Sequence, residues 1–309
     1  MKNLITGGAG FVGSHLVDAL LKEGQEVICL DNLHTGKTRN IDKWKSNPRF
    51  KFIFHDVEKP IDLEVDKIWH LACPASTIHY LRDPIKTSMT NYLGTLNMLE
   101  LAKNHKSELL LTSSSEVYGN PTCDIQTESY RGSINPNGVR SCYGEGKRIA
   151  ESLCTDYKRK YGTKVKIARI FNSYGPRMSK NDGRVISNFI YQAISGRPIT
   201  IYGDGSQTRS FCFIDDLILG IRKLMNTKYA APVNLGNSKE EYSILEIANL
   251  IKCKTNSTSR VINLPLPEDE PCRRKPSVNL AKELLNWVPE IDINKGLCKT
   301  IKYMEKIDD

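Results

Sequence analysis

The sequence predicts an α/β fold in which a doubly wound parallel sheet is followed by a smaller, mixed α/β domain. Short apolar runs alternate with helical patterns over residues 1–170, and this alternation is typical of parallel βαβ units. The strand runs, such as residues 109–111, are continuously apolar, as expected for strands that are buried on both faces. A chain of 309 residues is also long enough for two domains.

The first domain is expected to contain six strands, each a short run of branched or aromatic residues, at 2–6, 26–31, 49–56, 67–72, 108–114 and 164–170. Three longer segments have helical patterns, at 11–23, 84–104 and 143–161. Pro84 suits the first turn of the second helix, where its missing N–H costs no hydrogen bond. Histidine and tyrosine at positions 79 and 80 are expected in a loop after the fourth strand and are assigned no role.

After Phe171 the pattern changes, because Gly-Pro, Arg-Pro and Pro-Leu-Pro segments separate shorter elements. Helices are predicted at 185–195, 217–226, 244–254 and 294–306, and strands at 199–202 and 233–235. We therefore expect a first domain over 1–170 with a return segment near 207–237. Residues 171–206 and 238–309 are expected to form the second domain.

Composition excludes several classes of protein. Hydrophobic residues make up 39% and charged residues 26% of the chain, which is an ordinary globular mixture. No apolar run approaches the roughly 18 residues of a membrane-spanning helix, and the chain opens directly on a predicted strand, so no signal peptide is expected. The nine cysteines occur singly, without a C-x-x-C pair. They predict free thiols in a cytoplasmic protein and no metal site.

The positive charge lies almost entirely in the second half of the chain. Residues 1–150 carry 18 Lys and Arg against 17 Asp and Glu, whereas residues 151–309 carry 26 against 18. Such asymmetry indicates either an anionic partner or an ordinary solvated surface. The basic residues are not interleaved with aromatic ones as in a nucleic-acid module, so no nucleic acid is expected. A small phosphorylated ligand explains the surplus equally well.

A glycine-rich turn predicts a dinucleotide site. Gly7, Gly10 and Gly13 follow the first strand and open the first helix, where free N–H groups favour a diphosphate. Asp31 ends the second strand, the position from which a carboxylate binds ribose hydroxyls and repels a 2′-phosphate. The pattern indicates a Rossmann-type domain that binds NAD, although Lys37 and Arg39 leave NADP open.

A second motif predicts acid–base chemistry. Tyr143 and Lys147 begin a helix, so both side chains lie on one face. About 30 residues earlier, Ser114 ends a strand, and the carboxyl ends of parallel strands are where such sheets bind ligands. A nearby ammonium group and a positive nicotinamide would lower the pKa of a phenol from its usual value of about 10. The set suits hydride removal from a secondary alcohol.

These motifs together resemble the extended short-chain dehydrogenase/reductase superfamily, and within it the UDP-glucuronic acid decarboxylases. The resemblance runs nearly from end to end of the chain. The matching segments are 5–16 (ITGGAGFVGSHL), 115–119 (SEVYG), 142–148 (CYGEGKR), 168–172 (ARIFN), 175–178 (GPRM), 181–185 (NDGRV), 205–209 (GSQTR) and 274–276 (RKP).

The resemblance implies a role for each of three sets of residues. The residues implied to line the NAD site are Gly7, Gly10, Phe11, Val12, Asp31, Asn32, Thr35, Gly36, Asp56, Val57, Leu71, Tyr143 and Lys147. The implied catalytic residues are Ser114, Glu116, Tyr143, Lys147 and Arg274. The residues implied to bind the nucleotide sugar are Ser115, Asn172, Arg184, Asn188, Tyr202, Arg209 and Arg274.

The implied reaction has three steps on UDP-glucuronic acid: oxidation at C4, loss of the C6 carboxylate as carbon dioxide, and reduction to UDP-xylose, with NAD regenerated. The Ser115-Glu116 pair favours decarboxylation over 4,6-dehydration, for which the family pattern is Asp-Glu, and over 4-epimerisation, for which the glutamate is replaced by a small residue. Release of a UDP-4-keto-pentose would use the same pair. The family also implies a homodimer, formed through the helices at 84–104 and 143–161.

Several alternatives remain at the level of the sequence. The usual threonine is replaced by Ser114, which keeps the hydroxyl, and Cys73 stands where serine is expected. Taken alone, Glu116 would also serve to satisfy a loop amide, and Arg274 would suit a basic surface run. Cys142 is expected to pack rather than react. A catalytically idle NAD sensor or scaffold that binds RNA is the non-enzymatic alternative.

Overall fold

A parallel sheet forms the centre of the molecule in a computed structural model that describes residues 1–180 and 182–306. Asn181, which belongs to one of the matching segments, lies outside the described residues. Seven strands of the described chain pair in the order β11-β6-β5-β4-β1-β2-β3, all parallel. Their bounds are β1 Lys2–Thr6, β2 Glu26–Asp31, β3 Phe50–Phe54, β4 Lys67–His70, β5 Glu108–Ser114, β6 Val165–Ile170 and β11 Pro232–Leu235. The predicted doubly wound fold is confirmed.

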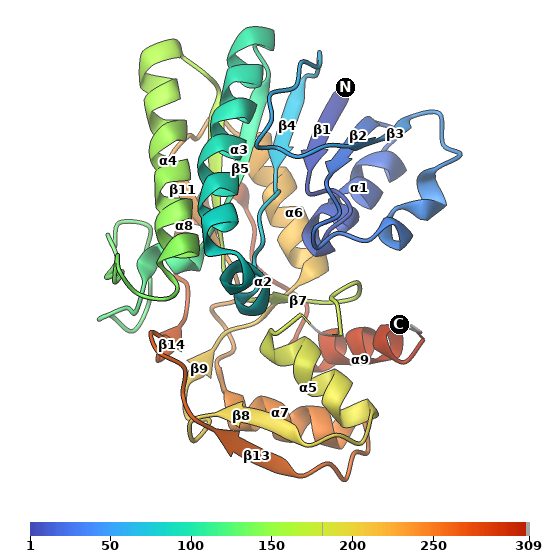
Figure 1. Ribbon diagram of the computed structural model, residues 1–309, viewed down its shortest axis with the longest axis vertical. Helices are drawn as coiled ribbons and strands as arrows, with labels where there is room; N and C mark the ends of the chain where they lie inside the picture. Colours follow the sequence, from blue (N-terminus) through green and yellow to red (C-terminus); the bar gives the residue numbers. More distant parts are fainter. Residues whose placement is uncertain (181, 307–309) are drawn as a thin grey trace.

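Helices cover both faces of this sheet (Figure 1). On one face, α3 (Pro84–His105) and α4 (Ser141–Tyr161) bury residues such as Met98 and Ala150 against β4, β5 and β6. On the other face, α1 (Phe11–Lys22) and α6 (Ile214–Met225) pack with Ile5, Val27 and Leu235. Because both faces are buried, the strands need no polar alternation, which explains their continuously apolar runs.

Element ends differ slightly from the sequence prediction. The helix predicted from Tyr143 begins at Ser141, and the one predicted from Leu217 begins at Ile214, where Asp215 and Asp216 lie in the first turn and favour a helix N-terminus. His79 and Tyr80 lie in a short helix, α2 (Thr77–Arg82), rather than in a loop. Six residues are too few for a helical pattern to be recognised in sequence.

The remaining elements are short and lie mostly below the main sheet in Figure 1. The helices are α5 Val185–Ile194, α7 Ile244–Lys254, α8 Asn279–Leu285 and α9 Ile293–Met304, and the 3-10 helices are η1 Thr38–Asn40, η2 Asp42–Trp44 and η3 Ser115–Tyr118. The strands are β7 Ser173–Tyr174, β8 Ile199–Tyr202, β9 Thr208–Arg209, β10 Cys212–Phe213, β12 Tyr242–Ser243, β13 Val261–Leu264 and β14 Arg273–Arg274. Two-residue strands carry no periodicity, so the sequence analysis did not find them.

The main sheet with its helices forms the first part of the molecule, and the smaller elements below it in Figure 1 form the second part. The chain crosses between these two parts more than once. After the second part begins, α6 and β11 return to the main sheet, where β11 pairs with β6. One hydrophobic cluster runs from Leu16 in α1 through Leu217 in α6 to Leu297 in α9. The division into domains at 170, 206 and 237 stays a prediction, because this shared core belongs to both parts.

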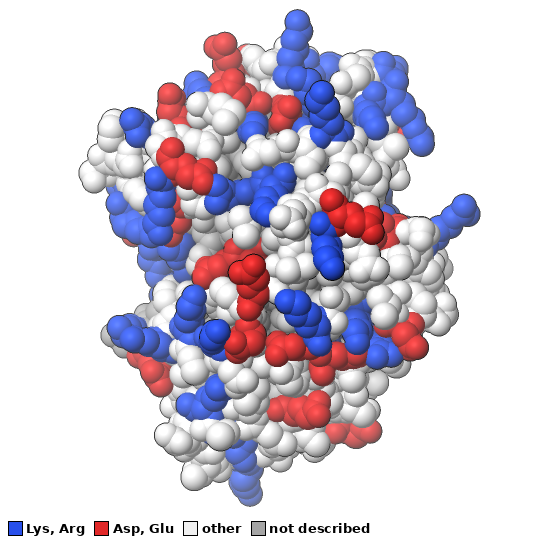
Figure 2. Space-filling model, turned by 180° about the vertical axis from the view of Figure 1, so that it is seen from behind, with Lys and Arg blue, Asp and Glu red and all other residues white. Residues whose placement is uncertain are grey.

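Acidic and basic side chains are interspersed over the face drawn in Figure 2. No large area of a single sign of charge stands out among the described residues on this face. Within residues 1–180 and 182–306, no helix has both the length and the apolar character that crossing a bilayer requires. All nine cysteines are free thiols.

A small sheet holds two arginines of the candidate site in register. β9 pairs with β12 in antiparallel and with β14 in parallel orientation, which sets Arg274 opposite Arg209. Glu241 fastens this sheet, because its carboxylate accepts hydrogen bonds from Arg273 Nε at 2.6 Å, from Lys275 Nζ at 3.0 Å and from Thr208 Oγ1 at 2.6 Å. The hydrogen bond from Arg273 lowers the pKa of Glu241 from 4.5 to about 2.

Replacement of Glu241 should therefore make stability depend less on pH. Because the folded-state pKa lies below the unfolded value, the carboxylate stabilises the fold fully above pH 4.5 and loses this effect as pH falls toward 2. We expect Glu241→Gln to lower the free energy of unfolding by about 1–2 kcal/mol at pH 7, with a smaller deficit at pH 3. Denaturant unfolding across this pH range measures it, with exposed Glu283→Gln as control. A deficit that stays constant with pH would contradict the assignment.

Candidate functional site

A pocket of about 360 Å³ opens at the carboxyl ends of β1, β2 and β4. Its floor comes from the glycine turn after β1, from Asp31 at the end of β2 and from Leu71 just after β4. Residues of the second part, among them Arg177 and Arg184, line it from the other side. The pocket therefore lies where parallel α/β sheets bind their ligands.

The glycine turn is shaped by backbone contacts that exclude side chains. Gly7 has a φ of +69°, and a Cβ on it would lie 2.9 Å from the Ala72 backbone. A Cβ on Gly13 would lie 2.1 Å from the Gly7 carbonyl oxygen. A Cβ on Gly10 would meet only that same oxygen, at 3.1 Å. The turn thus packs closely against the Ala72 backbone and against itself, and it leaves the N-terminus of α1 open to a diphosphate. These residues therefore fit a dinucleotide.

Asp31 is fixed in place by two backbone N–H groups. Its carboxylate accepts hydrogen bonds from Ala9 at 2.9 Å and from Leu33 at 2.8 Å. Burial raises the pKa of Asp31, and the two N–H groups partly offset this effect. A Cβ on Gly36 would lie 2.8 Å from the Asp31 carboxylate, so glycine there leaves room for the acid. This arrangement suits recognition of ribose hydroxyls.

Most of the predicted cofactor residues line this pocket. They are Gly7, Gly10, Phe11, Val12, Asp31, Asn32, Thr35, Gly36, Val57 and Leu71. Asp56 lies beside it, where its carboxylate accepts from Asn32 Nδ2 at 3.1 Å and pairs with Lys86 Nζ at 2.7 Å. Lys86 itself lines the pocket, and the sequence analysis missed it because no motif marks its position in α3.

Tyr143, Lys147 and Ser114 meet next to the inner end of the pocket. Lys147 Nζ lies 5.8 Å from the centroid of the Tyr143 ring, and the Ser114 hydroxyl forms a hydrogen bond with the Tyr143 phenol. Cys73, which lines the pocket, interacts electrostatically with Tyr143 and Lys147. The tyrosine and lysine predicted to contact the cofactor thus adjoin the pocket through Cys73.

Tyr143 is buried against another aromatic ring. Tyr80 stacks on it with ring centroids 5.0 Å apart and an angle of 5° between the planes. Burial and the nearby Cys73 thiol raise the pKa of Tyr143, and the hydrogen bond with Ser114 acts in the opposite direction. The phenol is therefore neutral at pH 7 in this state, and added positive charge beside it would favour the phenolate.

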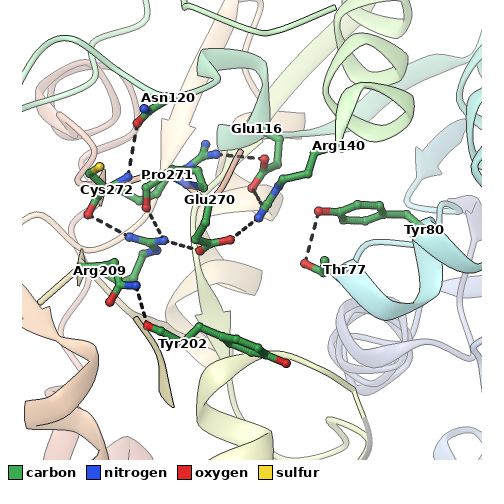
Figure 3. Close-up of polar contacts among 12 residues, drawn as sticks. Thr77, Tyr80, Glu116, Asn120, Arg140, Tyr202, Arg209, Glu270, Pro271 and Cys272 are labelled. Atoms are coloured by element: carbon green, nitrogen blue, oxygen red, sulfur yellow. Dashed lines mark hydrogen bonds and ion pairs between the residues drawn. The ribbon is translucent and has the colours of Figure 1, made fainter. Parts of the chain in front are cut away.

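Arginines and glutamates alternate in a chain of ion pairs (Figure 3), and one of these glutamates, Glu116, interacts electrostatically with Tyr143. Arg274 Nη2 lies 2.9 Å from Glu116 Oε2, and Arg140 Nη2 lies 3.0 Å from Glu116 Oε1. The other end of the Arg140 guanidinium pairs with Glu270, whose second oxygen lies 2.6 Å from Arg209 Nη2. Three predicted site residues, Glu116, Arg209 and Arg274, are thus brought into one network.

Glu116 is ionised in this network. Burial alone would raise the pKa of Glu116, but Arg274, Arg140 and Arg209 hold it below its usual value. The side chain of Arg274 is only 2% exposed and donates to the Ser115 carbonyl oxygen. The alternatives of a surface role for Arg274 and a simple loop contact for Glu116 are therefore wrong.

The other predicted substrate residues lie apart from this network. The Asn172 carbonyl accepts from the Cys212 amide at 2.9 Å. Arg184 lines the pocket and lies 5.3 Å from the Phe11 ring centroid. The Asn188 side chain accepts from the Gly183 amide at 3.0 Å. Tyr202 is exposed at the end of β8. The structure therefore places these residues around the sites already described rather than in one cluster.

The sequence analysis missed Arg140, Glu270 and the stacking role of Tyr80. Arg140 precedes Tyr143 by three residues and Lys147 by seven, so helical spacing offered a signal for it. The run Glu268-Asp269-Glu270 interrupts the basic second half just before Arg274, but nothing local indicates which arginines it meets. Tyr80 approaches Tyr143 only through the tertiary fold.

Comparisons with known proteins agree with this geometry. The model of the NAD dependent epimerase/dehydratase family matches residues 3–236. UDP-glucuronic acid decarboxylase 1 of Danio rerio is 52% identical over 98% of this chain and 72% of its own length. UDP-glucuronic acid decarboxylase 6 of Arabidopsis thaliana is 51% identical over 96% of this chain and 87% of its own.

A solved structure of a UDP-glucuronic acid 4-epimerase from Bacillus cereus, in complex with UDP-glucuronic acid and NAD, superposes with a TM-score of 0.89 at 31% identity. The match covers 99% of each chain. Fold, site geometry and sequence identity thus lead to one assignment. This chain belongs to the NAD-dependent epimerase/dehydratase family, within the extended short-chain dehydrogenase/reductases, and to its UDP-glucuronic acid decarboxylase branch.

Proposed function

We propose that this chain binds NAD and converts UDP-glucuronic acid into UDP-xylose and carbon dioxide through a UDP-4-keto intermediate. The observation that carries the proposal is the meeting of Tyr143, Lys147 and Ser114 with the Glu116–Arg274 ion pair. The tyrosine, lysine and serine suit oxidation of an alcohol, and the ion pair places a carboxylate and a guanidinium beside these three side chains. Relatives of about 52% identity that are named as decarboxylases support the same reaction.

The glycine turn and Asp31 would hold the dinucleotide, with its diphosphate at the N-terminus of α1. When bound, NAD supplies a hydride acceptor and later a hydride donor for C4 of the sugar. The remaining chemistry falls to side chains of this protein. Cys73 lines the pocket and Tyr143 lies next to Cys73, so the reacting ring of the cofactor would be held on this side of the pocket.

Tyr143 takes the proton of the C4 hydroxyl as that carbon is oxidised, and it returns a proton when the ketone is reduced. Lys147 is buried beside the ring and stabilises the phenolate. Ser114 donates to or accepts from the same oxygen, which keeps the phenol oriented. The tyrosine thus ends each cycle in the protonation state in which it began.

Decarboxylation follows from the ketone at C4, which lies β to the C6 carboxylate. The electrons of the breaking C5–C6 bond move into the ketone and form an enolate as carbon dioxide leaves. We assign Glu116 and Arg274 to this step, after which C5 takes up a proton. Because Ser115 is not an acid, the pair lacks the general acid that loss of the C6 hydroxyl would require.

Replacement of the tyrosine hydroxyl tests the acid–base assignment. We expect Tyr143→Phe to lower kcat by at least about 100-fold, the usual contribution of a positioned acid or base. The affinity for NAD, measured by fluorescence titration, should stay near that of the unchanged protein. Substantial residual turnover would remove Tyr143 from its role, and unchanged biological activity without turnover would favour an NAD sensor or scaffold.

The products distinguish the reactions open to this site. We expect proton NMR of the purified protein with NAD and UDP-glucuronic acid to show UDP-xylose, without added NADH. Accumulation of UDP-4-keto-pentose with NADH would mean that the ketone is released before reduction. Formation of a 4-epimer, without loss of carbon dioxide, would overturn the decarboxylation.

We further propose that two copies associate through α3 and α4. Large hydrophobic side chains on this side are exposed, at Ile85, Met89 and Tyr92 of α3 and Ile149 of α4. The three α3 residues are spaced by four and three and form one stripe. A stripe of this kind on a surface helix is typical of a protein–protein interface.

The free thiols support a reducing, cytoplasmic location.

A charge within the stripe should separate the subunits. We expect Ile85→Glu, at a side chain that is 77% exposed, to convert a dimer into a monomer in sedimentation velocity. Leu219→Glu on α6 makes a matched change at an exposed position on the opposite face of the sheet and should leave the dimer intact. A monomeric unchanged protein, or a dimeric Ile85→Glu, would contradict this interface.

A further inference from the structure

Glu270 occupies an unusual position between two arginines (Figure 3). Glu270 lies in the segment that joins β13 to β14, and its carboxylate bridges Arg140 and Arg209. Neither β13 nor β14 contains it, so the contact depends on a connecting segment rather than on a sheet. A single carboxylate thus links the helix that carries Tyr143 to the small sheet that carries Arg274.

The bonds of Arg209 show what this carboxylate blocks. Nη1 donates to the carbonyl oxygens of Thr208 at 2.9 Å and Cys272 at 3.2 Å. Nη2 donates to Glu270 at 2.6 Å and to the Pro271 carbonyl oxygen at 2.7 Å. These bonds use every N–H of the two terminal nitrogens. Of the four acceptors, only Glu270 is a side chain, and it alone is an anion.

Arg140 is occupied in a similar way. One terminal nitrogen pairs with Glu116 and the other with Glu270. Its buried Nε has no hydrogen-bond partner among the described residues. Each terminal nitrogen of Arg140 thus has a carboxylate beside it, with which an anionic ligand would compete. Each glutamate pairs with a second arginine, Glu116 with Arg274 and Glu270 with Arg209. The two differ in that Glu116 lies in η3, next to β5, whereas Glu270 lies in a connecting segment.

The charge count points the same way. Three arginines and two glutamates form the network, which leaves one excess positive charge. UDP-glucuronic acid carries a diphosphate and a carboxylate, so it meets a site whose positive charge is already partly neutralised. Removal of the Glu270 carboxylate from the two arginines would leave buried cations uncompensated, and a ligand anion would restore the balance.

The residues that precede Glu270 in its segment have few contacts with the rest of the site. Residues 264–268 are exposed, and the neighbouring Asp269 touches the rest of the protein through Asn135 Nδ2 at 3.4 Å. The Cys272 amide donates to the Asn120 side chain at 3.3 Å. On the other side of Glu270, the carbonyl oxygens of Pro271 and Cys272 accept hydrogen bonds from Arg209. Movement of the Glu270 carboxylate therefore depends on the exposed residues that precede it.

We propose that the Glu270 carboxylate occupies, in the empty site, the place of an anionic group of the ligand. It must leave Arg140 and Arg209 when the nucleotide sugar binds. This inference rests on the proposed function, because the ligand is taken to be a UDP-sugar. The group that replaces it is an anion, either the diphosphate or the carboxylate of the sugar. Glu270 thereby lowers the affinity of the empty site for anionic ligands, because only protein molecules in which Glu270 has left the two arginines can bind such a ligand.

The test compares Glu270→Gln with Glu268→Gln in a Tyr143→Phe background saturated with NAD, so that ligands bind without turnover. Glu268 lies two residues away and is exposed, so its replacement makes the same change in net charge. Calorimetry gives the Kd for UDP, UDP-glucose and UDP-glucuronic acid. We expect Glu270→Gln to bind UDP-glucuronic acid at least about fivefold more tightly, and Glu268→Gln to match the background.

The three ligands identify the displacing group. Tighter binding of all three would assign the diphosphate, whereas tighter binding of UDP-glucuronic acid alone would assign the carboxylate, and either result supports the substitution. Unchanged or weaker binding would overturn the proposal and show that Glu270 positions the arginines instead. Thermal unfolding, with Glu270→Ala as a second variant, excludes a fold defect as the cause. Failure of every variant and of the background to bind any UDP ligand would instead refute the proposed function.

Discussion

The ion pair between Glu116 and Arg274 is the interaction on which the candidate site depends. Glu116 lies in η3, two residues after the end of β5 in the main sheet, whereas Arg274 lies in β14 of the second part. The Arg274 side chain is only 2% exposed and that of Glu116 is 21% exposed, and charges so placed lose hydration at a cost in free energy unless they are paired. Each therefore requires the other, and the pair fixes how the small sheet meets the end of β5. The register of β9 against β14 then sets Arg209 beside Arg274, and Arg140 joins the chain from α4.

Helical periodicity explains why the acid–base group and the ionic network adjoin. Arg140 is the N-cap residue of α4, and Tyr143 and Lys147 follow it by three and seven residues. Residues at this spacing share one face of a helix, so a single face presents a guanidinium, a phenol and an ammonium group. The opposite wall is supplied by Ser114 and Glu116 at the end of β5. One helix N-terminus and one strand end thus carry most of the proposed chemistry, and the remaining cations come from the small sheet.

Local patterns were enough to predict the parallel sheet, the glycine turn, Asp31 and the Tyr143–Lys147 face, because each depends on residues close together in the chain. The structure adds what depends on distant contacts. Glu270 meets Arg140 across 130 residues, and no local signal selects that partner. The helix over Thr77–Arg82 and the two-residue strands β9 and β14 are too short for periodicity, yet they bring Tyr80, Arg209 and Arg274 to the site. The start of α6 lies three residues before its predicted position, because Asp215 and Asp216 in its first turn extend the helix beyond its apolar pattern.

The two central ionisable groups are held in opposite states by their surroundings. Burial raises the pKa of both Tyr143 and Glu116, but only Glu116 has arginines close enough to reverse the effect. The phenol is therefore kept neutral and the carboxylate ionised within one small volume. Environments that push neighbouring pKa values apart are what acid–base sites require. Burial thus outweighs the nearby Lys147 ammonium group in this state of the site, and further positive charge beside Tyr143 would favour its deprotonated form. A cationic nicotinamide ring bound in the adjoining pocket would add positive charge of this kind and favour the phenolate.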